Sequence, residues 1–286
     1  MKLFLIGANG QLGSDLRQAA AAAGHAVAGF THAQLDVRDA AALERAIAAE
    51  RPAAVISTAA FHKVEVCEQE PEPSFAVNAI GVLHLARACT RHGAVLVHFS
   101  TDYVFDGTQR APYRETDLPA PVNVYGASKA AGELLARAHC ARHFVIRTTG
   151  LYGKAGSSGK GGNFVETMLR KARAGEAIRV VEDQVLTPTY TVDLAAKVLE
   201  LLPTERYGLY HITNSGQCSW FEFAAEIFKL AGLPADLQPV SSESFRSPVR
   251  RPAYSVLAKT ALQAAGLAPP PTWQDALARY LRERGN

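Results

Sequence analysis

Short apolar runs alternate with longer amphipathic segments over the first two-thirds of the chain. Continuous apolar runs are typical of parallel strands that are buried on both faces, and helical spacing of apolar residues is typical of the segments between them. This alternation predicts a doubly wound α/β fold, in which a parallel Rossmann sheet has helices on both faces. The expected strands are Lys2–Ile6, His25–Gly29, Ala53–Ser57, Ala94–Phe99 and His143–Arg147, and the expected helices are Leu12–Ala23, Ala40–Glu50, Ser74–His92 and Val124–Ala141.

The pattern changes after Gly150. Residues 154–162 contain four glycines and two serines, a composition that predicts a flexible loop or lid. We therefore divide the chain into a Rossmann domain, 1–150, and a smaller C-terminal lobe, 151–286, and expect strands from about 185–213 to rejoin the sheet. The elements expected in the lobe are helices near Asn163–Ala174, Val192–Leu202, Trp220–Ala231 and Trp273–Arg282, and strands near Ile178–Val181 and Gly208–Thr213.

The composition argues against several classes of partner. The 286 residues include 30 basic and 27 acidic side chains, so no basic surface for nucleic acid is indicated. The four cysteines form no C-x-x-C pair and the histidines show no metal spacing, so we expect no metal site. The N-terminal apolar run is too short for a signal peptide or a membrane span, and we expect a cytoplasmic protein, monomeric or homodimeric, without membrane contact.

The strongest single motif is a glycine loop, Gly7-x-x-Gly10-x-x-Gly13, directly after the first expected strand. In such a loop one glycine permits a tight turn, one lets a dinucleotide pyrophosphate approach, and one lets the helix pack on the strand. The N-terminus of the following helix favours the anion. Glycine triplets also occur in purely structural turns, but the position at the first strand–helix junction favours a dinucleotide site, which would include Asn9, Gln11 and Leu12.

The second expected strand runs into Phe30-Thr31-His32 and has no carboxylate there. NAD-binding domains usually place an Asp or Glu at this point to bind the ribose hydroxyls, and an acid would repel the 2′-phosphate of NADP. The sequence therefore allows NADPH as well as NADH. Asp36 and Val37 come later and are placed to reach the adenine, although Asp36 is equally well interpreted as a solvated loop carboxylate.

Tyr125 and Lys129 are four residues apart in an expected helix, so a phenol and an ammonium lie on one helical face. A nearby ammonium lowers the pKa of a phenol from its ordinary value of about 10. Tyr125 would then protonate a ketone oxygen as hydride arrives at the carbon, and Lys129 would also hold the nicotinamide ribose. The same spacing is common on exposed helices, so the pair needs a third group to define a site.

That third group follows the fourth expected strand, in Ser100-Thr101. Ligands of open parallel sheets lie outside the carboxyl ends of the strands, where either hydroxyl can hydrogen-bond the reacting carbonyl. The glycine loop, the strand-end Ser-Thr and the Tyr-x-x-x-Lys pair, in this order, resemble the extended short-chain dehydrogenase/reductase superfamily over nearly the whole chain.

Longer motifs narrow the resemblance to the dTDP-4-dehydrorhamnose reductase family. The resemblance implies that NADPH or NADH reduces the 4-keto group of a nucleotide-linked 6-deoxy sugar, dTDP-4-dehydro-L-rhamnose, to dTDP-L-rhamnose. It also implies Thr101, Tyr125 and Lys129 as the catalytic triad, with Ala59, Ala60 and Asn78 along the cofactor and Tyr103 beside the sugar. The motifs are Gly10-Gln11-Leu12-Gly13, residues 100–107, Asn123-Val124-Tyr125-Gly126, Gly162-Asn163-Phe164, Asp183-Gln184 and Arg251-Pro252.

One segment departs from the family pattern. Where the family often has a tryptophan against the sugar, this chain has Gly150, which leaves Leu151 or Tyr152 as replacements and leaves the exact sugar open. Of His62, Lys63 and Glu65, after the third strand, one is a candidate substrate contact, with a solvated loop as the simpler interpretation. Arg250 and Arg251 suit a diphosphate, because guanidinium groups pair with it in a fork. The remaining substrate-binding candidates are Asp102, Asn163 and Gln184, and structural hydrogen bonding is an equal alternative for the last two.

Two further functions stay open at this point. An epimerase of the same superfamily would retain its cofactor and consume none, and a 4,6-dehydratase would need an Asp-Glu pair where this chain has Asp102-Tyr103. A non-catalytic subunit that regulates a partner enzyme is a different class of function, and the retained Thr101, Tyr125 and Lys129 argue against it.

Overall fold

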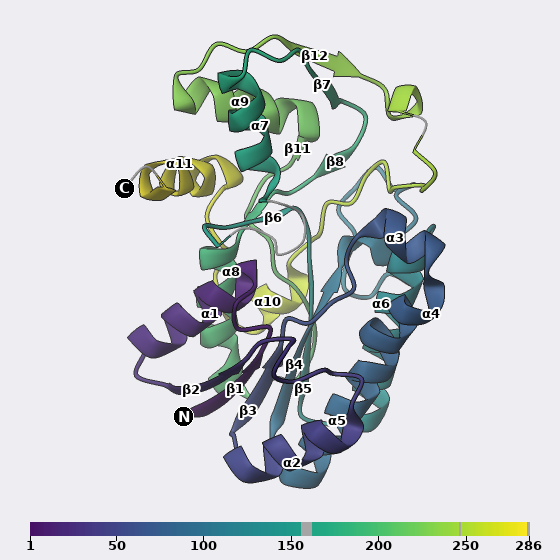
Figure 1. Cartoon of the computed structure of the whole chain (residues 1–286), viewed down its shortest axis with the longest axis vertical. Coiled ribbons are helices and arrows are strands. Elements are labelled where there is room, and N and C mark those ends of the chain that lie inside the picture. The colour runs from purple at the N-terminus through teal and green to yellow at the C-terminus, as the bar shows by residue number, and fades with distance from the viewer. Residues whose placement is uncertain (156–161, 246, 285–286) are drawn as a thin grey trace.

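The computed structural model describes residues 1–155, 162–245 and 247–284 of the chain (Figure 1). Its larger lobe is built on a six-stranded sheet with the order β10-β5-β4-β3-β1-β2, in which all neighbouring strands are parallel. The predicted doubly wound α/β fold is confirmed. The strands are β1 (Lys2–Ile6), β2 (Ala26–Phe30), β3 (Ala54–Ser57), β4 (Val95–Thr101), β5 (His143–Thr148) and β10 (Gly208–His211).

Helices cover both faces of this sheet (Figure 1). On one face α1 (Gln11–Ala22) packs against α8 (Thr191–Leu201), and α10 (Thr260–Ala264) lies against β10. On the other face lie α2 (Ala40–Glu50), α5 (Gly81–His92) and α6 (Val124–His139). Each face has its own apolar core, and this burial on both sides explains why the strands are continuous apolar runs.

The smaller lobe lies beyond the carboxyl ends of the strands (Figure 1). It contains α7 (Phe164–Arg173), α9 (Trp220–Ala231) and α11 (Trp273–Arg284), with the parallel pair β7 (Ile178–Val181) and β12 (Leu237–Val240). Its core is aromatic, and the rings of Tyr152 and Tyr190 stack with centroids 5.6 Å apart. Four short strands pair in this part of the molecule, β6 (Leu151–Tyr152) with β9 (Thr189–Tyr190) and β8 (Val185–Leu186) with β11 (Cys218–Ser219).

Two elements differ from the sequence expectation in ways that shape the cleft. The expected helix Ser74–His92 is divided into α4 (Pro71–Phe75), a π-helical turn η1 (Ala76–Ile80) and α5. The fourth strand extends to Thr101, because the polar Ser100 and Thr101 still pair with Arg147 and Thr148 of β5. The remaining short helices are α3 (Val64–Gln69), η2 (Asp102–Val104), η3 (Leu202–Thr204) and η4 (Ser242–Phe245).

Most of the glycine-rich loop expected at 154–162 lies outside the described residues, which omit 156–161. Within the ranges that the structure describes, no helix combines the length and the apolar character needed to cross a bilayer. Over the same ranges, His, Cys, Asp and Glu side chains do not gather into a group of three or more that could hold a metal ion.

Candidate active site

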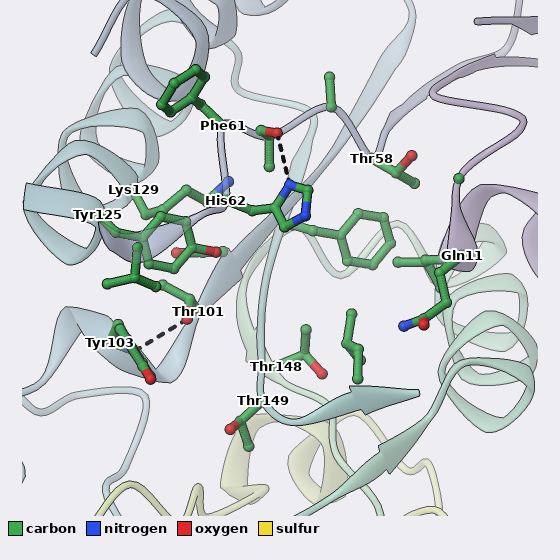
Figure 2. A pocket seen from close by; sticks show the side chains of 18 of the residues that line it. Gln11, Thr58, Phe61, His62, Thr101, Tyr103, Tyr125, Lys129, Thr148 and Thr149 are labelled. Atoms are coloured by element: carbon green, nitrogen blue, oxygen red, sulfur yellow. Dashed lines mark hydrogen bonds between the residues drawn. The ribbon is translucent and has the colours of Figure 1, made fainter. Parts of the chain in front are cut away.

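A cleft of about 830 Å³ opens at the carboxyl ends of the sheet strands, between the two lobes (Figure 2). Its walls come from the loops after β1, β2 and β3, from the ends of β4 and β5, and from α6, α7 and the start of α9. Figure 2 shows Thr101, Tyr125 and Lys129 toward one end and Gln11 and Thr58 toward the other. Open parallel sheets bind ligands in this position, where the strand order changes direction.

The glycine loop forms one end of the cleft and fits a dinucleotide pyrophosphate. Gly7 has a φ of +77°, in the left-handed region that favours glycine, and a Cβ on Gly13 would lie 2.0 Å from the Gly7 carbonyl oxygen. The backbone therefore turns as tightly as such a loop requires. The side-chain Oε1 of Gln11 is buried without a hydrogen-bond partner among the described residues. Asn9, Gly10, Gln11 and Leu12 line the cleft, whereas Gly13 packs behind the loop.

The part of the cleft wall that follows β2 contains His32, Asp36, Val37 and Arg38, where the sequence analysis expected the adenine. Arg38 donates from Nη2 to Asp36 Oδ2 at 2.6 Å and from Nε to the same carboxylate, and this hydrogen bonding lowers the pKa of Asp36. Asp36 is therefore an ion-paired carboxylate whose side chain is partly exposed to solvent. Arg38 is only two residues from Asp36 in the sequence, but that it lines the cleft is known only from the structure.

The predicted catalytic residues converge at the opposite end. Thr101 ends β4, while Tyr125 and Lys129 lie one turn apart on α6. The helix begins after Asn123, whose Oδ1 accepts a hydrogen bond from Gly126 N at 2.8 Å. A Cβ on Gly126 would lie 2.0 Å from the Tyr103 carbonyl oxygen, so glycine allows α6 to pack directly on the turn that follows Thr101. This close packing brings the Tyr125 phenol beside the strand end.

Burial dominates the electrostatics of the Tyr125–Lys129 pair. Burial raises the pKa of Tyr125 well above its ordinary value, and the Asp102 carboxylate raises it further. The direction of this shift is opposite to the lowering that the sequence analysis expected from Lys129, because desolvation of the phenolate dominates it. Burial also lowers the pKa of Lys129 to about 8. Tyr125 thus carries its proton at neutral pH, as a general acid must.

Asp102 is a buried carboxylate immediately behind Thr101. It accepts hydrogen bonds from Thr101 Oγ1 at 3.0 Å and from Thr149 Oγ1 at 2.8 Å. Burial raises its pKa, and the hydrogen bonds from Ser255, Thr149 and Thr101 oppose that rise. Thr149 and Ser255 also line the cleft, and the sequence analysis did not select either as a site residue. Their hydrogen bonds to Asp102 connect the end of β5 and the C-terminal segment to the turn that follows β4.

The other predicted contacts divide into two groups. Ala59, Ala60, Tyr103 and Gln184 lie in the cleft wall, and Tyr103 meets Tyr125 edge-on with ring centroids 5.8 Å apart. Asn163 also lies there, but its amide is engaged by the Gly153 carbonyl, the Tyr280 hydroxyl and the Glu166 N–H. His62 extends its ring into the cleft, with Nδ1 3.3 Å from the Ala60 carbonyl oxygen, whereas Lys63 and Glu65 are not wall residues (Figure 2).

Four predicted residues lie outside the cleft wall: Gly13, described above, and Asn78, Arg250 and Arg251. Asn78 lies in the π-helical turn, where its amide bonds both the N–H and the carbonyl of Phe61 and so fixes the loop after β3. Arg251 pairs with Glu65 and donates to Ser247 Oγ at 2.7 Å. The Arg250 side chain is exposed. Asn78 was suggested by the family resemblance alone, and the two arginines mostly by it. The positions of these three side chains in space could not be derived from the sequence pattern.

The aromatic wall that Gly150 leaves open comes from another part of the chain. Tyr152 cannot replace the missing ring, because it is buried in the core of the smaller lobe, whereas Leu151 lines the cleft. Gly150 has a φ of +57°, and a Cβ there would lie 2.9 Å from Leu186 Cδ1. Trp220 and Phe164, with ring centroids 4.6 Å apart, supply the aromatic surface instead. Neither was identified from the sequence, since both lie far from residue 150 along the chain.

A pyrophosphate-type loop at one end of the cleft and a buried tyrosine acid at the other define an enzyme of the short-chain dehydrogenase/reductase type. A family model described as "RmlD substrate binding domain" matches residues 1–285. The chain belongs to this family, that of the dTDP-4-dehydrorhamnose reductases.

Individual relatives agree with this placement over their whole length. The chain is 41% identical to the spore coat polysaccharide biosynthesis protein SpsK of Bacillus subtilis, covering 100% of this chain and 98% of that protein. It is 40% identical to the dTDP-4-dehydrorhamnose reductase of Streptomyces griseus, with 96% and 91% covered. The crystal structure of the Bacillus anthracis dTDP-4-dehydrorhamnose reductase in complex with NADP superposes with a TM-score of 0.95 at 39% identity, covering 99% of each chain.

Proposed function

We propose that this protein uses NADPH or NADH to reduce the 4-keto group of dTDP-4-dehydro-L-rhamnose and forms dTDP-L-rhamnose. The observation that carries the proposal is the protonated, buried Tyr125 beside Thr101, at the opposite end of one cleft from the glycine loop. Residues 1–150 would hold the cofactor and most of 151–286 the nucleotide sugar, with Trp220 and Phe164 beside the sugar nucleotide. Two of the relatives named above are dTDP-4-dehydrorhamnose reductases, which supports this sugar as the substrate to test first.

The residues of the chain divide the chemistry among them. Bound NADPH or NADH supplies the hydride to the keto carbon. Tyr125 donates its phenolic proton from Oη to the keto oxygen, so the alcohol forms without a free alkoxide. Lys129 provides a buried positive charge beside the phenol and the ribose, and Thr101 orients the Tyr125 hydroxyl. Gly7, Gly10 and the N-terminus of α1 would hold the pyrophosphate, and Asp36 and Val37 the adenosine.

The direct test is an absorbance assay of NADPH and, separately, NADH oxidation with dTDP-4-dehydro-L-rhamnose, with the sugar product identified by NMR. We expect one reduced cofactor to be consumed for each dTDP-L-rhamnose formed. Absence of oxidation with this sugar and with other nucleotide-linked 4-keto sugars would overturn the proposal. An epimerase would change the sugar without net loss of reduced cofactor, and a regulatory subunit would bind NADPH without turnover, so the same assay separates these functions.

A further inference from the structure

A buried ion pair lies directly behind the cleft. Glu133 of α6 accepts hydrogen bonds from Arg147 of β5, at 2.6 Å from Nη2 to Oε2 and at 2.8 Å from Nε to Oε1. The Ser100 hydroxyl of β4 donates to the same Oε1. The side chains of Arg147 and Glu133 are only 2% and 4% exposed, so this pair is almost completely removed from water.

The ion-pair cluster is defined here as Ser100, Glu133 and Arg147. Ser100 itself lines the cleft, and each of the three is close along its strand or helix to another residue of the cleft. Ser100 precedes Thr101 on β4, and Arg147 precedes Thr148 on β5. Glu133 follows Lys129 by four residues on α6, which places the two side chains on one face of the helix. Both are buried there, yet Lys129 makes no ion pair within 4.0 Å among the described residues. Glu133 therefore acts on Lys129 through space.

The charges around Lys129 leave Glu133 as its main electrostatic support. Burial lowers the pKa of Lys129 to about 8, and the Glu133 carboxylate acts in the opposite direction. From β4, His98 faces it, buried and without a hydrogen-bond partner at either ring nitrogen among the described residues. Burial and the Lys129 charge lower the His98 pKa, so this ring is neutral. Tyr125, one turn away on α6, is protonated, and the guanidinium of Arg147 shares the Glu133 carboxylate.

Stability alone does not explain a buried pair of this kind. Removal of two charges from water costs about as much as, or more than, their attraction returns, and well-packed apolar residues often replace such pairs without loss. A fixed negative charge beside a buried ammonium has a chemical use, because it favours the protonated amine. We propose that Glu133 is a positioning residue that keeps the Lys129 ammonium charged, and that Ser100 and Arg147 hold its carboxylate in place. The kinetic consequence of this inference rests on the proposed reductase function.

The test compares the pH dependence of kcat/KM in the wild-type protein and in Glu133→Gln, which keeps the shape and the acceptor oxygen but removes the charge. We expect the wild-type rate to fall as pH rises through about 8, where Lys129 loses its proton. In Glu133→Gln this alkaline limb should move down by about one pH unit or more, which lowers the rate about fivefold near pH 8 and about tenfold well above it. A purely structural role would reduce the rate equally at all pH values and would overturn the inference, as would an unshifted limb.

Two further variants separate charge from folding. Arg147→Lys keeps the carboxylate and a cation beside it, so the alkaline limb should stay in place whatever the absolute rate. If Glu133→Gln fails to fold, the double variant Glu133→Gln/Arg147→Met removes both charges together. Its limb should move in the same direction but by less, because the Arg147 charge that disfavours a protonated Lys129 is also removed. A limb that moves with Arg147→Lys, or that stays in place in the folded double variant, would contradict the proposal.

A second readout requires no sugar. Because Lys129 is placed to hold the nicotinamide ribose, the dissociation constant for NADPH, followed by its fluorescence, should rise with pH in both proteins and at a lower pH in Glu133→Gln. If the wild-type protein binds NADPH but reduces no keto sugar, the proposed function fails while this titration still tests Glu133. An identical pH dependence in the wild type and Glu133→Gln would overturn the role of Glu133 alone.

Discussion

The hydroxyl of Thr101 donates a hydrogen bond to the carboxylate of Asp102, with 3.0 Å between Oγ1 and Oδ1. A threonine hydroxyl has one hydrogen, so this bond leaves the Thr101 oxygen as an acceptor toward Tyr125. The backbone N–H of Tyr103 also donates to that oxygen, at 3.2 Å. Thr101 is thus fixed from two sides, as its proposed role in orienting the Tyr125 phenol requires.

Replacement of Thr101 by valine should therefore disturb proton transfer more than binding. Thr101→Val keeps the side-chain shape but removes the acceptor, and we expect kcat to fall by about 10²-fold with an NADPH dissociation constant within about threefold of wild type. Steady-state kinetics and fluorescence titration would measure both quantities. Thr101→Ser retains the hydroxyl and should recover most of the rate; a valine variant as active as the serine variant would exclude this role.

The Asp36–Arg38 pair is expected to control the choice between NADPH and NADH. Asp36→Asn removes a negative charge near the adenosine and releases the Arg38 guanidinium, which can then pair with a 2′-phosphate. We expect the ratio of NADH to NADPH dissociation constants to rise about fivefold, which corresponds to about 1 kcal/mol. Asp39→Asn is the matched control, because Asp39 caps α2 and does not line the cleft. An equal effect in both variants would refute a local role for Asp36.

Trp220 is expected to contact the nucleotide sugar and not the cofactor. Trp220→Ala removes an aromatic side chain from the cleft wall, and we expect KM for the nucleotide sugar to rise about tenfold while NADPH binding changes less than twofold. Phe221→Ala provides the control, since Phe221 is the next residue of α9 and is not part of the cleft wall. Parallel kinetics on the two variants test this assignment, and equal KM values would contradict it.

The Glu133–Arg147 pair also makes a prediction about stability. Arg147→Met leaves the Glu133 carboxylate buried without its cation, and we expect the free energy of unfolding to fall by about 3–5 kcal/mol in urea denaturation. The exposed ion pair between Lys2 and Glu50 serves for comparison. Lys2→Met should change the free energy of unfolding by less than about 1 kcal/mol. Similar losses of unfolding free energy in the two variants would show that burial of the ion pair does not determine how much stability is lost.

Local patterns in the sequence were sufficient to predict the strands and helices that carry the site. The apolar periodicity located the five N-terminal strands to within two residues, and the glycine loop and Tyr125–Lys129 lie where strand ends and helix starts require them. The rest depends on contacts between distant positions. Trp220 lines the same cleft as Gly150, and Arg147 pairs with Glu133, only because the fold brings these residues together. Asn78 lies in a π-helical turn that helical periodicity does not reveal.

The most direct measurement is the single-turnover rate of NADPH oxidation by the wild type and by Tyr125→Phe, with dTDP-4-dehydro-L-rhamnose in excess. Phenylalanine keeps the ring and removes only the proton donor, so the rate should fall by about 10²–10⁴-fold while the dissociation constants for NADPH and sugar nucleotide stay within about threefold. A Tyr125→Phe protein that oxidises NADPH at close to the wild-type rate would show that Tyr125 is not the catalytic acid.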